Sequence, residues 1–183
     1  AGYGWSDPGR GERTTATIVH ELNLLINKAE IPGPFVLVGH SFGGFTARYL
    51  AAKFPKNVVG LVLVDSSHPD QIYRLSALDK VKQKSLVTGR KNLPPEDFSE
   101  FERKWYFLNS SRKATFAQMG ELKYFKESAY QVKHSGPIKD IPVAVLSRGI
   151  RQLPELSGIS LENEWQDMQK DLLKLSKNSW HLI

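Results

Sequence analysis

The sequence predicts an α/β protein with a mostly parallel sheet, helices that flank the sheet, and a helical insertion. Short apolar runs bounded by turn residues are typical of buried strands, and they occur at residues 35–38, 58–64 and 141–147. Helical patterns separate these runs, which is the alternation that a parallel sheet requires. A long segment with no strand-like run, residues 71–135, predicts the helical insertion.

Composition places the chain among globular proteins of about one domain. It has 183 residues, of which 40% are hydrophobic and 24% are charged. Because cysteine is absent, disulfides, thiolate metal sites and a catalytic cysteine are excluded. No apolar run approaches the roughly 20 residues that span a bilayer, so no membrane span is expected. No secretory signal is visible and a cytoplasmic location is favoured, although the chain opens on Ala1 rather than on methionine.

The formal net charge of +6 raises the question of a nucleic-acid partner. The 25 Lys and Arg residues outnumber 19 Asp and Glu residues, mostly in the middle and C-terminal parts of the chain. These bases alternate with glutamates and apolar residues and accompany no nucleic-acid motif, which indicates solvated helix faces. We therefore expect no nucleic-acid partner, and a basic nucleic-acid or membrane-surface module is only the third hypothesis for this chain.

The elements before the insertion follow from their patterns in order. Residues 14–29 carry apolar side chains at helical spacing, and Thr14 or Thr15 can cap the start of that helix. A second helix over residues 45–54 ends before a proline. The near-continuous apolar run at residues 58–64 is typical of a strand buried on both faces of a parallel sheet.

Residues 71–135 show helical patterns rich in basic residues and contain no strand-like run. The length of this segment far exceeds that of an ordinary crossover, so we interpret residues 71–135 as a cap laid over the turn at residues 39–44. The core is then formed by residues 1–70 and 136–183. Two aromatic stripes at helical spacing are expected to pack mostly between the cap and the core: Phe98, Phe101, Trp105 and Leu108, then Phe116, Met119, Leu122 and Phe125.

Two strands and one helix are expected after the insertion. The third strand lies at residues 141–147, and residues 148–160 are expected to form a loop. A fourth strand begins at residues 180–183. Between them residues 162–175 form a helix with the apolar stripe Trp165, Met168, Leu172 and Leu175.

The turn at residues 39–44, Gly-His-Ser-Phe-Gly-Gly, carries the candidate chemistry. A Gly-x-Ser-x-Gly segment between a strand and a helix presents its serine, Ser41, clear of the backbone at a helix N-terminus. Gly39 and Gly43 lack the Cβ atoms that would clash in so tight a turn. A serine hydroxyl is a weak nucleophile that needs a base, and the amide of Phe42 is placed to stabilise an oxyanion. The alternative is a glycine-rich connection in which Ser41 only caps the helix.

With these features the chain resembles the α/β-hydrolase superfamily, most closely its capped ester- and amide-hydrolase branch. Residues 1–6 resemble the loop after the fourth strand of that family, and residues 35–44 resemble its fifth strand and nucleophile turn. The sixth, seventh and eighth strands are matched by residues 58–65, 141–147 and 180–183. The resemblance implies that the first strands lie before Ala1 and that the catalytic histidine lies in a loop beyond Ile183. The chain is thus expected to be an internal fragment of a capped serine hydrolase.

The resemblance leaves the acid of the catalytic triad open among three carboxylates. Asp65 stands where some relatives carry an acid after the sixth strand, and we favour it over Asp70 and Glu155. In that role the Asp65 carboxylate would hold the tautomer of an imidazole and stabilise its cation. No histidine stands at the catalytic position of the family, and we expect surface or structural roles for His20, His40, His68, His134 and His181, with His40 pointing away from the substrate side and His68 the least unlikely exception.

Together the residues and the resemblance predict a serine hydrolase. It would act on an ester, amide or related acyl bond of a small, partly apolar molecule through an acyl-enzyme on Ser41, with neither a metal nor an organic cofactor. Asp65 would orient the downstream histidine, and the chain on its own would be inactive without that histidine. The alternative is a small-ligand-binding protein on the same scaffold whose turnover is slow or lost.

Overall fold

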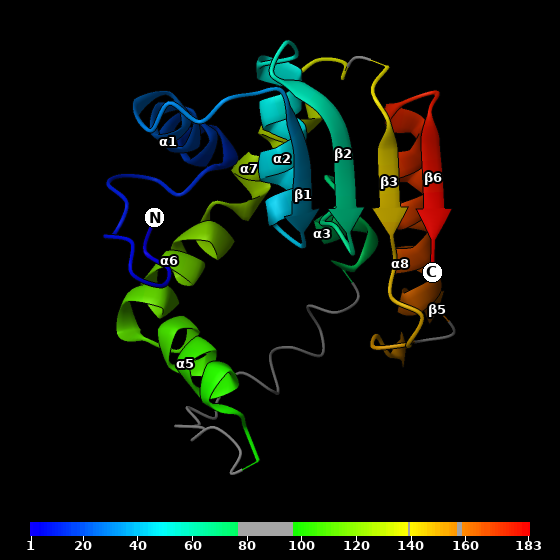
Figure 1. Ribbon diagram of the computed structural model, residues 1–183. Coiled ribbons are helices and arrows are strands. Elements are labelled where there is room, and N and C mark those ends of the chain that lie inside the picture. Colours follow the sequence, from blue (N-terminus) through cyan, green and yellow to red (C-terminus); the bar gives the residue numbers. More distant parts are fainter. Residues whose placement is uncertain (77–96, 139, 157–158) are drawn as a thin grey trace.

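A four-stranded parallel sheet organises the part of the chain that the computed structural model describes, residues 1–76, 97–138, 140–156 and 159–183. The strands lie in the order β1-β2-β3-β6 (Figure 1), and their bounds are β1 Phe35–His40, β2 Val58–Val64, β3 Val143–Leu146 and β6 Ser179–Leu182. Strands that follow one another in this sheet are therefore neighbours, and helices lie in the connections between them. This arrangement confirms the predicted α/β class and all four predicted strands.

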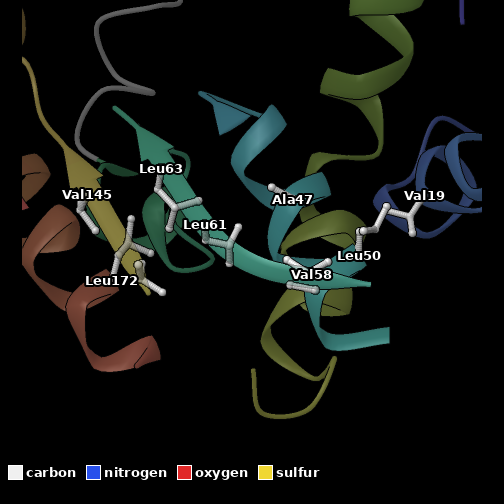
Figure 2. Packing of buried hydrophobic residues seen from close by; sticks show 10 residues of the cluster. Val19, Ala47, Leu50, Val58, Leu61, Leu63, Val145 and Leu172 are labelled. Carbon is white, nitrogen blue, oxygen red and sulfur yellow. The ribbon is translucent and has the colours of Figure 1, made fainter. Parts of the chain in front are cut away.

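The hydrophobic core lies on one face of the sheet. Leu61 and Leu63 of β2 and Val143 and Val145 of β3 point to this face and are fully or almost fully buried. They pack beneath α2 (Gly43–Lys53) and η2 (Leu172–Leu175), as Figure 2 shows. The buried members of the cluster are Val19, Ala47, Leu50, Ala51, Val58, Leu61, Leu63, Val143, Val145 and Leu172.

The opposite face of the sheet corrects the prediction that residues 58–64 are buried on both faces. The register places Val36 and Val38 of β1 on the same face as Trp180 and Leu182 of β6. These four side chains are 53–68% exposed. The reason is that α2 and α8 (Leu161–Asp171) lie behind the strands in Figure 1, on the side that carries the core. Within the described ranges the sheet is thus covered on one face.

The first helix, α1 (Thr15–Lys28), begins where the sequence predicts. The Thr14 hydroxyl accepts a hydrogen bond from the Thr17 amide at 3.2 Å, which is the expected N-cap. Two side chains of α7 (Phe125–Lys133) satisfy further amides of this helix start. The Ser128 hydroxyl accepts from Thr15 N at 3.0 Å, and the side-chain oxygen of Gln131 accepts from Ala16 N at 2.8 Å. The N-terminus of α1 therefore ties residues 125–133 to the core.

The described part of the region predicted as the helical insertion is mostly helical. It contains α3 (Gln71–Arg74), α5 (Glu100–Asn109), α6 (Arg112–Lys123) and α7. Ser99 and Glu102 form a reciprocal capping box at the start of α5. No helix in the described ranges is long and apolar enough to cross a bilayer.

The expected packing of the aromatic stripes is wrong at most positions. Phe101, Trp105, Phe116, Met119 and Leu122 are 59–76% exposed. This exposure arises because α5 and α6 extend away from the sheet (Figure 1), whereas α7 packs against α1 and α2.

Phe125 is the position at which the expected packing between the insertion and the core is confirmed. Its ring centroid lies 5.9 Å from that of Phe42 and 5.2 Å from that of Phe45. These aromatic contacts hold the start of α7 against the start of α2.

The segment after β3 departs from the predicted loop over residues 148–160. It contains a two-stranded antiparallel ladder, β4 (Glu155–Leu156) with β5 (Ile159–Ser160). Such two-residue strands carry too few alternating residues for a periodicity to reveal them. The helix that follows is confirmed as α8 and η2, with Trp165, Met168 and Leu172 buried as predicted.

Candidate active site

The backbone between β1 and α2 makes a tight left-handed turn at Ser41. The φ angle of Ser41 is 51°, a region that residues other than glycine rarely adopt. A Cβ atom on Gly39 would lie 2.6 Å from the carbonyl oxygen of Gly43, so glycine is required there. The prediction of a similar clash at Gly43 is wrong, because a Cβ there would meet open space. The second glycine that the turn requires is Gly44, whose Cβ would overlap the Ser66 side chain.

Backbone hydrogen bonds fix Ser41 at the carboxyl edge of the sheet. The Ser41 amide donates to the Val64 carbonyl at 3.2 Å. The Ser41 carbonyl accepts from the amides of Gly44 and Ser67, both at 3.0 Å. The serine is therefore held by its own turn and by the segment that follows β2. Ligand sites in open parallel sheets lie at this edge.

Phe42 joins the serine to the start of α2. Its amide donates no hydrogen bond to any residue in the described ranges, as expected for the first amides of a helix. Its ring packs against that of Phe45 at 5.7 Å. A free N–H beside Ser41, on an anchored residue, is the arrangement that can stabilise an oxyanion.

A cavity of about 620 Å³ opens beside Ser41. Residues of the turn, of the segment after β2, of α6 and of the start of α7 line it. Its lining residues are Tyr3, Ile18, His40, Ser41, Phe42, Gly43, Thr46, Ser67, Gln71, Gln118, Glu121, Leu122 and Phe125. The candidate nucleophile thus faces a space large enough for a small organic molecule.

Asp65, the favoured acid, ends β2 with a φ of 42° and is held by two donors. Trp165 Nε1 donates to its Oδ1 at 2.7 Å, and Arg148 Nη1 donates to its Oδ2 at 2.6 Å. Asp65 therefore shares the carboxyl edge of the sheet with Ser41, although it is not among the described residues that line the cavity.

The two other candidate acids are surface carboxylates in ion pairs. Asp70 pairs with Lys133 at 2.7 Å, and this contact holds the pKa of Asp70 below its usual value. Glu155, in β4, is exposed, and its Oε1 lies 3.6 Å from Arg151 Nη1. Neither carboxylate lines the cavity among the described residues.

None of the five histidines in the chain contacts the hydroxyl of Ser41. His181 Nε2 lies 2.6 Å from the Ser147 hydroxyl, within the sheet. His134 Nδ1 lies 2.8 Å from the Tyr130 carbonyl, and the two rings lie 4.1 Å apart. These contacts are structural, as the sequence predicts for both residues.

His40 and His68 have more specific environments. His40, the last residue of β1, is exposed and is among the residues that line the cavity. Burial and the charge of Arg48 lower the pKa of His68 to about 4, and the His68 Nδ1 accepts from the Asp70 amide at 3.2 Å. His68 is therefore neutral at physiological pH.

Buried polar residues of α8 that the sequence analysis missed support the Asp65 segment. Gln169 accepts from the Ser66 amide at 3.2 Å and donates to the Ser66 carbonyl at 2.8 Å. Although burial opposes the shift, the amides of Gln152 and Leu153 and the Arg148 guanidinium lower the pKa of Glu162 to about 2. The sequence could have revealed the burial of these two polar residues, because Glu162 and Gln169 lie at helical spacing from Trp165, on the face of α8 predicted to be apolar.

The cavity contains a second feature that was missed, a hydrogen bond of 2.8 Å from the Tyr3 hydroxyl to Glu121 Oε2. No pattern in the sequence connects these two residues, because they are 118 positions apart. No group of three or more potential metal ligands occurs within the described ranges.

This architecture matches a known family. Residues 1–141 match the family described as the alpha/beta hydrolase fold. The chain belongs to the α/β-hydrolase fold family. That membership confirms the resemblance to this superfamily found in the sequence.

Individual proteins that are similar to this chain match different shares of it. The uncharacterized protein YqjL of Bacillus subtilis is 26% identical over 179 residues, which is 98% of this chain and 59% of YqjL. Lipase LipV of Mycobacterium tuberculosis is 55% identical over 42 residues, 23% of this chain and 15% of the lipase. A haloalkane dehalogenase variant from Bradyrhizobium elkanii superposes with a TM-score of 0.64 at 16% identity, over 99% of this chain and 69% of the dehalogenase. The chain thus spans less than two thirds of the length of YqjL.

Proposed function

We propose that this chain carries the nucleophile of a serine hydrolase that forms an acyl-enzyme on Ser41. The substrate would be a small, partly apolar molecule with an ester, amide or related acyl bond. One observation carries the proposal: Ser41 holds a left-handed backbone conformation beside an open cavity and next to a free helix amide. A strained conformation of this kind costs about 1–3 kcal/mol and tends to persist at functional sites.

In the proposed reaction the Ser41 oxygen attacks the carbonyl carbon of the substrate, and its proton passes to an imidazole. The carbonyl oxygen becomes an oxyanion, and the Phe42 amide donates a hydrogen bond to it. Collapse of the tetrahedral intermediate releases the alcohol or amine, which takes the proton from the imidazole. Water then hydrolyses the ester on Ser41 by the same route in reverse order.

We assign the base to a histidine that follows β6 in the sequence, the place to which the family resemblance points. Asp65 is our choice for the acid that orients it. A carboxylate has about four lone-pair sites, and the bonds from Trp165 and Arg148 use two of them. Asp65 can therefore accept a further hydrogen bond from an imidazole N–H while these two donors hold it in position.

A fluorophosphonate probe tests the nucleophile. The protein is used with any natural sequence that flanks residues 1–183, because the relatives are longer. We expect one covalent adduct, located at Ser41 by peptide mass spectrometry and abolished in S41A. S110A is the matched control, because Ser110 is an ordinary helix C-cap residue. Absence of an adduct in the wild type, or an adduct that persists in S41A, would contradict the proposal.

The alternative is a binding protein with slow or lost turnover, and one observation favours it. No described side chain donates or accepts a hydrogen bond at the Ser41 hydroxyl, so this part of the chain holds no activating base in contact with it. Pre-steady-state kinetics with a chromogenic ester in excess over the protein separate the two functions. A burst followed by steady turnover supports the hydrolase, and stoichiometric acylation without turnover supports the binding protein.

A further inference from the structure

The electrostatic character of the cavity beside Ser41 differs from that of the chain as a whole. The chain has a formal net charge of +6, yet no Lys or Arg is among the described residues that line this cavity. Glu121 of α6 supplies the single carboxylate among them. A fixed negative charge in a concave site with few competing cations has more influence on a ligand than the same charge on the surface.

The contacts of Glu121 leave half of its carboxylate unused. Oε2 accepts the hydrogen bond from Tyr3, and Oε1 has no partner within the described ranges. Two cations influence Glu121, first Arg13 and then the amino terminus at Ala1. Arg13 is itself engaged, because its Nη1 lies 2.8 Å from Glu21 Oε1. Burial raises the pKa of Glu121, while the Tyr3 hydrogen bond and these two positive charges oppose that shift. A half-buried carboxylate with a free oxygen is stabilised by any ligand that brings a donor to it.

We propose that Glu121 selects substrates that carry an ammonium or another cationic nitrogen group. The proposal rests on the proposed serine hydrolase function, since it places the scissile carbonyl at Ser41 and the cation at Glu121, both of which line this cavity. Leu122, Phe125 and Ile18 also line it and would contact the apolar part of the substrate. The substrate class is therefore a cationic amphiphile, such as an ester whose acyl or alcohol chain ends in an amine.

The same charge acts against anions. An anionic substrate would place a second negative charge in the cavity with Glu121, and the like charges would repel each other. Hydrogen bonds to a charged partner commonly change affinity by about tenfold to a hundredfold. The preference for a cationic over a neutral chain of equal length should fall in this range.

The test compares three p-nitrophenyl esters of equal acyl length whose chains end in an ammonium, a methyl or a carboxylate group. We expect kcat/KM to fall in that order in the wild type, by about tenfold or more between the ammonium and methyl esters. E121Q should bring these two values close together without changing the fold, because the side chains are nearly isosteric. E127Q is the matched control: it removes one negative charge from an exposed position on α7 outside the cavity, and it should preserve the preference.

Two further variants distinguish a failure of the selectivity proposal from a failure of the hydrolase assignment. Y3F removes the hydrogen bond to Glu121 but keeps the carboxylate, so the charge preference should survive it. S41A, assayed by calorimetric binding of the three esters, reports the preference without any turnover. Equal values for the three esters, or a preference that E121Q retains, would overturn the selectivity proposal. Hydrolysis of none of them, together with preferential binding of the ammonium ester by S41A, would overturn the hydrolase assignment and leave the role of Glu121 standing.

Discussion

The two glycines nearest Ser41 in the motif, Gly39 and Gly43, have opposite environments, which permits a sharp test of the turn. In G39A the new Cβ would lie 2.6 Å from Gly43 O and 2.8 Å from both Gly43 C and Gly44 Cα. The shortest of these distances is about 0.8 Å below the 3.4 Å at which ordinary contacts begin. All three atoms belong to the backbone and cannot rotate away, so the turn itself must open.

The expected loss of unfolding free energy in G39A follows from the rigidity of these backbone atoms. Overpacking usually costs 1–3 kcal/mol, and a clash with fixed backbone atoms belongs at the upper end, about 3 kcal/mol. For a chain of this size that corresponds to a fall in Tm of roughly 6–12 °C. G43A should be neutral or stabilising by up to about 1 kcal/mol, because its Cβ meets open space and alanine favours the first turn of α2.

Thermal unfolding followed by circular dichroism measures both variants, and fluorophosphonate labelling reports the position of Ser41. We expect G39A to lose both stability and labelling and G43A to retain its stability. If the two variants unfold within about 2 °C of each other, the tight approach at Gly39 does not exist in solution, and the account of the turn is wrong.

Three further predictions concern the elements around the turn. S41G should be more stable than S41A by about 1 kcal/mol in urea titrations, because glycine adopts the left-handed conformation at Ser41 without strain. W165F should lose about 2 kcal/mol, since it removes one donor from the Asp65 carboxylate while it keeps an aromatic ring. The pKa of His68 is lowered to about 4 from 6.5, so the native state binds fewer protons than the unfolded state between these values. Stability should therefore fall as the pH drops through this window, by at most about 2 kcal/mol after allowance for partial exposure, and H68Q should lack this contribution.

Matched substitutions make these outcomes specific. W5F removes the same N–H from an 86% exposed tryptophan and should be neutral. H20Q, on an exposed position of α1, should keep the pH dependence that H68Q loses. Equal urea midpoints for S41G and S41A, an equal loss in W5F and W165F, or an unchanged pH profile in H68Q would each contradict the corresponding argument.

The sheet and its helices were predictable because their sequence signals are local. Apolar runs and helical periodicity located all four strands of the main sheet, the helix after β1 and the helix before β6. The turn at Ser41 was predictable for the same reason, since six consecutive residues carry the strand end, the turn and the helix start. The ladder of β4 and β5 was missed because two residues are too few to display a period.

The features that sequence reasoning missed depend on contacts between distant segments. The need for glycine at position 44 comes from Ser66, and the environment of Asp65 comes from Arg148 and Trp165. The exposure of most of the aromatic stripe reflects how α5 and α6 lie relative to the sheet, which periodicity does not encode. Helical spacing shows which residues share a face, but not which neighbour that face meets.

The hydrogen bond from the Ser67 amide to the Ser41 carbonyl has a practical consequence for anyone who redesigns this protein. It links the backbone of the segment after β2 to that of Ser41. Substitutions at residues 65–70 that shift this backbone would therefore also shift Ser41. Substitutions on α6 border the same cavity without this backbone link, and mutant libraries that start there would leave the geometry of the serine intact.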